Sequence, residues 1–215
     1  MNRSGQCGAK EAMVLDNPNS RRTLAHLVDP VAKLLIKARI TPDALTWFGS
    51  GATLVISVVF LARGDFLLGA VLFGIFGLVD LLDGTMARML GTSGPWGAFL
   101  DSTLDRVSDS AVICSICFYY ANSDLPNGNL VASAGVVALV MGLMTSYARA
   151  KAESLNAQCT IGIAERAERN ILIYVALLLT SLVTDVMSYA FVILAIVSTV
   201  TVIQRIVYVR KQLVL

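Results

Sequence analysis

The sequence is poor in charged residues and contains a single histidine. Only 15% of its 215 residues are charged, 56% are hydrophobic, and the mean hydropathy is +0.70. About a quarter of the residues in soluble domains are charged, so this composition indicates an integral membrane protein. The lone His26 excludes a histidine-based metal site and argues against a Ser-His-Asp catalytic triad.

The four cysteines do not form a metal-binding set. Cys114 and Cys117 make a CxxC pair, but no second pair of ligands accompanies it. We therefore interpret both as small buried hydrophobic residues on a membrane helix.

The first residues lack the features of a targeting segment. Residues 1–23 are polar and basic, so we expect no cleavable signal. We interpret residues 1–20 as a disordered tail or a cloning remnant. Residues 21–215 are predicted to form a single membrane domain.

Hydrophobic runs predict an all-α integral membrane protein with six transmembrane helices between about residues 41 and 213. A membrane helix needs about 20 residues, and three of the runs reach that length only by continuing through charged residues. Two of these longer helices are predicted over 66–90 and 95–121, and the third begins near Ala164. The apolar runs are 44–62, 66–79, 110–123, 125–148, 170–184 and 186–204.

An amphipathic helix is predicted before the first membrane span, over residues 21–39. Its apolar residues fall at helical spacing, with Lys33 and Lys37 off that face. We expect it to lie in the membrane interface, with a break near Pro30; the alternative is a helix packed on the bundle. Thr41-Pro42-Asp43 then starts the first span. The apolar positions are Leu24, Leu27, Val28, Val31, Leu34 and Leu35.

Basic residues are nearly absent from one end of the predicted bundle. In an up-and-down path, the loops at that end contain only Arg63 among the 17 Lys and Arg residues. The positive-inside rule then places the charged helix ends, both termini and the functional site on the cytoplasmic side. We expect a multi-pass protein of the cell (inner) membrane with a polar cavity open to the cytoplasm.

Four aspartates interrupt the apolar segments: Asp80, Asp83, Asp101 and Asp105. The first two are three residues apart and the last two are four apart, so each pair shares a helix face. Four close carboxylates repel one another unless a cation joins them, and an all-oxygen set suits Mg²⁺, Mn²⁺ or Ca²⁺. Mg²⁺ is the expected ion, with Mn²⁺ also possible. Two ions about 3.5–4 Å apart would clamp a phosphoryl group. The alternative is that the acids only form salt bridges with nearby arginines.

Residues beside the acids suit a phosphorylated ligand. Gly84 and Ala87 leave room for a ligand near the backbone, and Arg88 adds a cation. The loop of residues 91–94 is rich in backbone N–H groups that can hold phosphate oxygens.

This pattern resembles the signature of the CDP-alcohol phosphotransferase family. Eight residues over 26 match it, and the likeness extends over about residues 24–212. The family resemblance implies a two-metal site, a CDP-linked donor and a homodimer. The matching residues are Asp80-x2-Asp83-Gly84-x2-Ala87-Arg88-x8-Gly97-x3-Asp101-x3-Asp105.

The resemblance also implies roles for individual residues. All four acids would be metal ligands, and Asp105 would also be the base for the acceptor hydroxyl. Gly97 is interpreted as a packing glycine. The residues implied to bind CDP-diacylglycerol are Asp43, Thr46, Gly84, Ala87, Arg88, Ser93 and Gly94.

A second, basic cluster bears on the acceptor alcohol. Five cations and a serine lie at the predicted cytoplasmic mouth, which favours an acceptor with a phosphate. This segment resembles the bacterial phosphatidylinositol-phosphate synthase branch of the family, although Arg and Lys stand in the reverse of the usual order at two positions. The expected acceptor is inositol 1-phosphate, a water-soluble phosphorylated polyol. The residues expected to bind its phosphate are Ser146, Arg149, Lys151, Arg166, Arg169 and Arg205.

Two alternatives remain open at this level. Phosphatidylglycerophosphate synthase would use the same chemistry with glycerol 3-phosphate. A divalent-cation transporter could use the acids as a pathway, but the sequence shows no internal repeat and the acids lie toward one face. No feature points to a nucleic acid partner.

Overall fold

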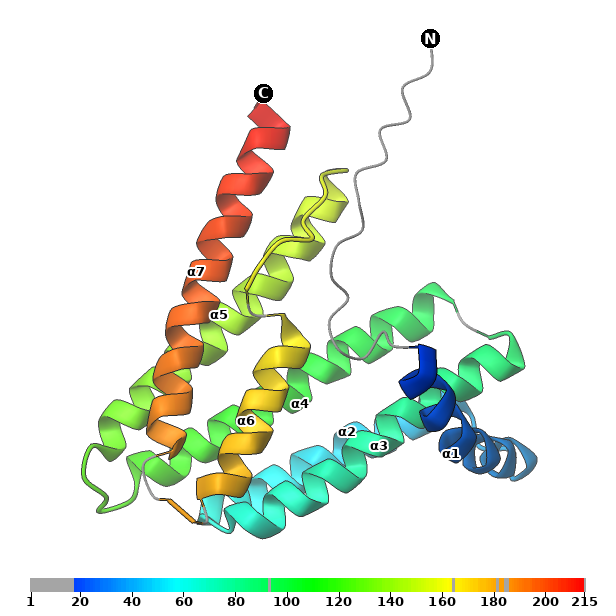
Figure 1. Cartoon of the computed structure of the whole chain (residues 1–215), viewed down its shortest axis with the longest axis horizontal. Helices are drawn as coiled ribbons and strands as arrows, with labels where there is room; N and C mark the ends of the chain where they lie inside the picture. Colours follow the sequence, from blue (N-terminus) through cyan, green and yellow to red (C-terminus); the bar gives the residue numbers. More distant parts are fainter. Residues whose placement is uncertain (1–17, 93, 164, 181, 184–185, 215) are drawn as a thin grey trace.

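The computed structural model describes residues 18–92, 94–163, 165–180, 182–183 and 186–214, and within these ranges it contains helices and no strand. This confirms the all-α class. The elements, shown in Figure 1, are α1 (Pro18–Lys37), α2 (Pro42–Val59), the short 3-10 helix η1 (Leu61–Arg63), α3 (Phe66–Leu90), α4 (Pro95–Ala121), α5 (Gly128–Ser154), α6 (Arg166–Thr180) and α7 (Val186–Val214).

The helix ends follow local signals in the sequence. Thr41 caps α2, because its hydroxyl oxygen accepts a hydrogen bond from the backbone N–H of Ala44 at 3.2 Å. Helix α3 continues through Asp80 and Asp83, the first half of the acidic motif (Asp80, Asp83, Asp101 and Asp105). It stops at Gly91, whose φ of 63° is a left-handed conformation that glycine adopts more readily than other residues. Pro95 then opens α4. The predicted helices over 66–90 and 95–121 are confirmed.

Helix α1 is continuous, so the predicted break near Pro30 is wrong. A helix can pass through proline when the lost N–H bond is outweighed by packing. Ala32 is fully buried and forms an apolar cluster with Leu45 of α2 and Met86 of α3. This packing places α1 against α2 and α3, and its predicted position at the membrane interface stays a prediction.

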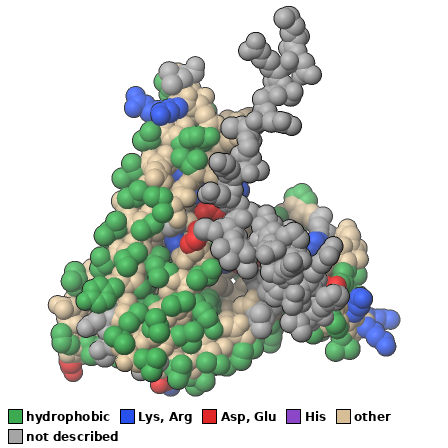
Figure 2. Space-filling model, viewed as in Figure 1, with side chains coloured by type: hydrophobic (Ala, Val, Ile, Leu, Met, Phe, Trp, Pro, Cys, Tyr) green, Lys and Arg blue, Asp and Glu red, His purple; other side chains and the backbone are tan. Residues whose placement is uncertain are grey.

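Four of the described helices are long and apolar enough to cross a membrane. They are α2 with η1 (Pro42–Arg63), α3, α5 and α7. Helix α6 has only 15 residues, and α4 carries several charges in its first half. Large apolar side chains such as Trp47, Val55 and Ile196 are about 60% exposed, and Figure 2 shows hydrophobic side chains over much of one face. Such a surface is suited to lipid, and the chain is an integral membrane protein.

The hydrophobic core lies at the end of the bundle opposite the charges. Ile116, Leu177, Met187 and Phe191 pack there at 0% exposure. In Figure 1 the ends of α2, α4 and α6 converge at the lower left with the starts of α3, α5 and α7. The charged ends spread away from this point. The core therefore anchors a bundle whose polar half is more open.

Candidate active site

The start of α2 connects the two helices that carry the acidic motif. The Thr46 hydroxyl donates to Asp83 Oδ2 on α3 at 2.6 Å. Asp43, one turn earlier, accepts a hydrogen bond from Trp96 Nε1 at the start of α4, at 2.9 Å. Helix α2 packs against both α3 and α4. Asp43 and Thr46, which are predicted to bind the donor, thus also hold the start of α2 against α3 and α4.

The acids of the motif differ in burial. Asp83 is 7% exposed, the side chain of Asp105 is 13% exposed, and Asp101 is exposed. The side chain of Asp80 lies outside the described part. Within that part, no three acidic, histidine or cysteine residues gather closely enough to hold a metal ion. The four-acid ligand set therefore stays a prediction.

The chemistry of the described donors nevertheless fits a divalent cation. Asp83 is a buried carboxylate that a hydroxyl group orients. Metal-ligating carboxylates are usually held by such an outer hydrogen bond. Carboxylate oxygen is the ligand that Mg²⁺ and Mn²⁺ prefer.

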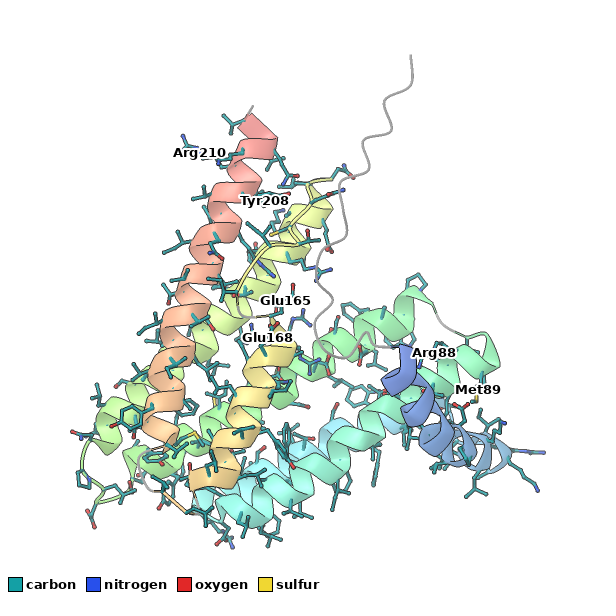
Figure 3. The ribbon with its side chains drawn as sticks, in the orientation of Figure 1. Arg88, Met89, Glu165, Glu168, Tyr208 and Arg210 are labelled. Atoms are coloured by element: carbon teal, nitrogen blue, oxygen red, sulfur yellow. The ribbon has the colours of Figure 1, made fainter. Side chains whose placement is uncertain are left out.

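The space beside the acids is open, as predicted. Among the described atoms, a Cβ atom added at Gly84 would meet Arg88 Nη1 alone, at 3.8 Å. Arg88 is exposed near the end of α3 (Figure 3), and its Nη2 donates to Thr85 Oγ1 at 3.0 Å. Ser93 lies outside the described residues, and Gly94 is the N-cap of α4. A Cβ at Gly97 would meet no described atom within 4 Å, so the described part of the chain does not show the close helix approach expected there.

Arg166, the first residue of α6, joins two acids of α4. Its Nη1 donates to Asp105 Oδ2. Its Nε donates to Asp109 Oδ2 at 2.9 Å, and its Nη2 lies 3.4 Å from Asp109 Oδ1. Asn170 Nδ2 donates to the same Asp109 Oδ1 at 3.0 Å. A guanidinium group therefore lies directly beside the predicted base.

The two glutamates at the start of α6 form a helix cap and do not pair with Arg166 in any contact that the described part of the structure shows. Glu165 and Glu168 lie in the middle of the molecule in Figure 3. Glu168 Oε2 accepts a hydrogen bond from the backbone N–H of Glu165 at 2.5 Å, which caps the helix. Arg166 is ion-paired with Asp105 and Asp109 of α4.

Arg169 lies one turn further along α6, against α5. A Cβ at Gly142 would lie 3.3 Å from its guanidinium carbon, so the Arg169 side chain packs closely against the α5 backbone there. Arg169 and Ser146 line a small cavity of about 20 Å³. Nη1 of Arg169 is buried, and no described residue accepts a hydrogen bond from it. A buried donor of this kind is suited to an anion or a water molecule.

Arg205 is buried at 3% exposure and binds backbone carbonyl groups. Its Nε donates to the carbonyl of Ile161 at 2.8 Å, and its Nη1 donates to that of Thr145 at 2.6 Å. Arg205 thereby fastens the α5–α6 connection to α7. These contacts indicate a structural role beside the predicted phosphate-binding one.

The remaining predicted cations are peripheral. Arg149 is half exposed and pairs with Glu153 on the next turn, Nε to Oε1, at 2.9 Å. Lys151 is exposed. The structure brings Ser146, Arg166 and Arg169 toward α4 but leaves these two side chains at the surface.

Sequence reasoning assigned no function to Trp96, Asp109 and Asn170. Asp109 continues the four-residue spacing of Asp101 and Asp105, and that spacing could have identified it. Asn170 and Asp109 are 61 residues apart in the sequence and lie on different helices, so no local sequence pattern predicts their contact.

Comparison with known proteins agrees with this geometry. The sequence profile of CDP-alcohol phosphatidyltransferase matches residues 39–211. The chain belongs to this family. This transferase is 37% identical over 196 residues to phosphatidylinositol phosphate synthase of Cutibacterium acnes, covering 87% of this chain and 94% of the relative.

Solved structures are similar along most of the chain. The crystal structure of Mycobacterium tuberculosis phosphatidylinositol phosphate synthase with CDP-DAG bound has a TM-score of 0.82 and 30% identity, over 86% of this transferase and 94% of that chain. The same enzyme in complex with manganese and citrate has a TM-score of 0.80 and 31% identity, over 84% and 87%. The fold of this chain is therefore similar to that of solved proteins named as phosphatidylinositol phosphate synthase, in agreement with the family that its sequence matches.

We expect Thr46→Val to weaken metal use by this transferase. Valine keeps the shape of threonine but cannot donate to Asp83, and loss of such an outer contact typically costs about 10–100-fold in metal affinity or activity. The Mg²⁺ concentration for half-maximal CMP release should rise about tenfold. The control is Thr53→Val, because the Thr53 hydroxyl bonds only the Gly49 carbonyl of its own helix at 3.0 Å. Equal behaviour of the two variants would contradict the role of Thr46.

We expect Arg205→Met to destabilise the fold. Methionine removes both donors from the carbonyls of Ile161 and Thr145, at a cost of about 2–3 kcal/mol. The Tm of the purified protein should fall by about 5–10 °C. The control is Arg210→Met, an exposed position on the same helix. An unchanged Tm with weakened acceptor binding would instead support the phosphate-binding role.

Proposed function

We propose that the chain transfers the phosphatidyl group of CDP-diacylglycerol to a hydroxyl group of inositol 1-phosphate, releasing CMP. The observation that carries this is the contact between Arg166 and Asp105. It places an anion-binding group next to the acidic motif of a CDP-alcohol phosphatidyltransferase. The relatives named phosphatidylinositol phosphate synthase support the same acceptor.

The acidic motif would hold two divalent ions, with Mg²⁺ as the expected ion and Mn²⁺ as a substitute. Asp80, Asp83, Asp101 and Asp105 would supply the oxygens. The orientation of buried Asp83 by Thr46 supports this, as does manganese in the solved relative. When bound, such ions neutralise the diphosphate and lower the energy of the departing CMP.

The reaction would proceed by in-line displacement. The acceptor hydroxyl oxygen forms a bond to the β-phosphorus of the donor, and the bond from that phosphorus to the CMP oxygen breaks. Asp105 takes the hydroxyl proton. Arg88 stands at the open edge beside Gly84, where it can pair with the diphosphate. Asp43, Thr46, Ala87, Ser93 and Gly94 complete the proposed donor site. The protein contributes positioning and electrostatic stabilisation.

The acceptor phosphate would bind beside α6. Arg166 is adjacent to Asp105, and Arg169 presents a buried donor that an anion would satisfy. The cavity of about 20 Å³ shared with Ser146 is too small for a sugar phosphate, so the phosphate would bind at its mouth. Arg149 and Lys151 could draw the anion in from the surface.

The arrangement in the membrane is also part of the proposal. Residues 21–215 would form one domain, with α2 to α7 crossing the cell membrane and α1 at its interface. The gathering of charged ends on one side supports a cytoplasmic site. A homodimer is expected from the family resemblance.

The test is CMP release by the purified protein with CDP-diacylglycerol and Mg²⁺. Inositol 1-phosphate, glycerol 3-phosphate, inositol and serine would be compared as acceptors. The proposal expects release with inositol 1-phosphate and little with unphosphorylated inositol. Release only with glycerol 3-phosphate would make the protein a phosphatidylglycerophosphate synthase with the same mechanism. No release with any acceptor would overturn the donor assignment.

A further inference from the structure

The guanidinium group of Arg166 has two different edges. The edge formed by Nε and Nη2 faces Asp109, at 2.9 and 3.4 Å. The Nη1 corner faces Asp105. Because the guanidinium is planar and its donors are fixed in a fork, holding one edge decides where the remaining donor points.

Asp109 is itself firmly held. Its side chain is only 14% exposed, and Asn170 donates to its Oδ1 at 3.0 Å. Asn170 lies one turn after Arg166 on α6, so the same helix supplies both partners. Two side chains of α6 therefore hold Asp109 in place.

We propose that Asp109, supported by Asn170, is a positioning residue that limits Arg166 to its Nη1 contact with Asp105 and so favours binding of metal and substrate by Asp105. Without Asp109, the Nε and Nη2 edge of Arg166 would lose its contacts with that carboxylate. Arg166 would then turn its fork onto Asp105 and form a two-point ion pair, the preferred geometry of arginine with a carboxylate. That pair would compete directly with a cation for the Asp105 oxygens.

This inference rests on the proposed function in one respect, namely that Asp105 is a metal ligand. It goes beyond that function because Asp109 and Asn170 are outside the eight-residue motif. It also makes a prediction that simple structural damage does not. Removing Arg166 as well should undo the effect of removing Asp109, since the competing group is then gone.

The experiment measures Mn²⁺ binding to the full-length purified protein by electron paramagnetic resonance, with no substrate present. Asp109→Asn should weaken Mn²⁺ binding about tenfold, as expected for a new charge-assisted contact to a ligand oxygen. The double variant Asp109→Asn/Arg166→Gln should bind within about twofold of Arg166→Gln alone. Ser110→Ala is the matched control, because its hydroxyl bonds the Arg106 carbonyl of its own helix at 2.6 Å. It should bind like the unaltered protein.

Two outcomes would overturn the inference: unchanged Mn²⁺ binding in Asp109→Asn, or weakened binding that Arg166→Gln fails to restore. If Asp109→Asn does not fold, Asn170→Leu answers the same question, with a smaller loss that Arg166→Gln again reverses. A separate arm with Asp105→Asn tests the proposed function. Undiminished Mn²⁺ binding there would remove Asp105 from the ligand set, whatever the Asp109 variants show.

Discussion

Asp105→Asn is expected to lower CMP release by about a thousandfold. The amide cannot take the proton of the acceptor hydroxyl, and general base catalysis typically contributes about 10²- to 10⁴-fold. The amide oxygen can still accept the hydrogen bond from Arg166, so local packing should be preserved. The measurement is the rate of CMP release at saturating CDP-diacylglycerol, acceptor and Mg²⁺, with Mn²⁺ binding recorded in parallel.

The control is Asp124→Asn, an exposed acid in the loop after α4, at the opposite end of the bundle. It should release CMP at the rate of the unaltered protein. Asp105→Asn protein that still binds metal and turns over at the normal rate would contradict the assignment of Asp105 as the base.

Arg166→Gln is expected to lower kcat/KM for the acceptor about a hundredfold. Glutamine retains hydrogen-bonding capacity but loses the charge and the fork that suit a phosphate. Because Arg166 is assigned to the acceptor phosphate and not to the donor, the KM for CDP-diacylglycerol should change little. The measurement is steady-state CMP release with each substrate varied in turn.

The matched control is Arg63→Gln, which removes a cation from the opposite loop. It should leave both substrates unaffected. A loss in Arg166→Gln that falls on the donor KM alone would show that Arg166 belongs to the donor site.

Local signals in the sequence predicted most of the helix boundaries. The charged ends of α3 and α4 could be predicted because a membrane helix needs about 20 residues, and the apolar runs alone are shorter than that. Thr41, Gly91 and Pro95 mark their helix ends through capping and φ preferences that act over a few residues. The break expected at Pro30 failed because tertiary packing around Ala32 outweighs one lost hydrogen bond.

The candidate site was only partly accessible to sequence reasoning. The spacing of the acids places each pair on one helix face, and the described atoms leave space beside Gly84. Partner choice across helices was not accessible. Arg205 was interpreted as a phosphate ligand from its charge, yet it binds the carbonyls of Ile161 and Thr145, which are 44 and 60 residues away. Likewise, nothing local indicates that Arg166 pairs with α4 instead of its neighbouring glutamates.

We propose above all that the acidic motif (Asp80, Asp83, Asp101 and Asp105) holds divalent metal over the donor diphosphate. Anomalous X-ray diffraction from crystals grown with Mn²⁺ and CDP-diacylglycerol tests it most directly. The expected result is manganese peaks in the anomalous difference map between Asp80, Asp83, Asp101 and Asp105, with the ions in contact with the diphosphate oxygens. Manganese bound elsewhere, with CDP-diacylglycerol seated away from these four acids, would contradict it.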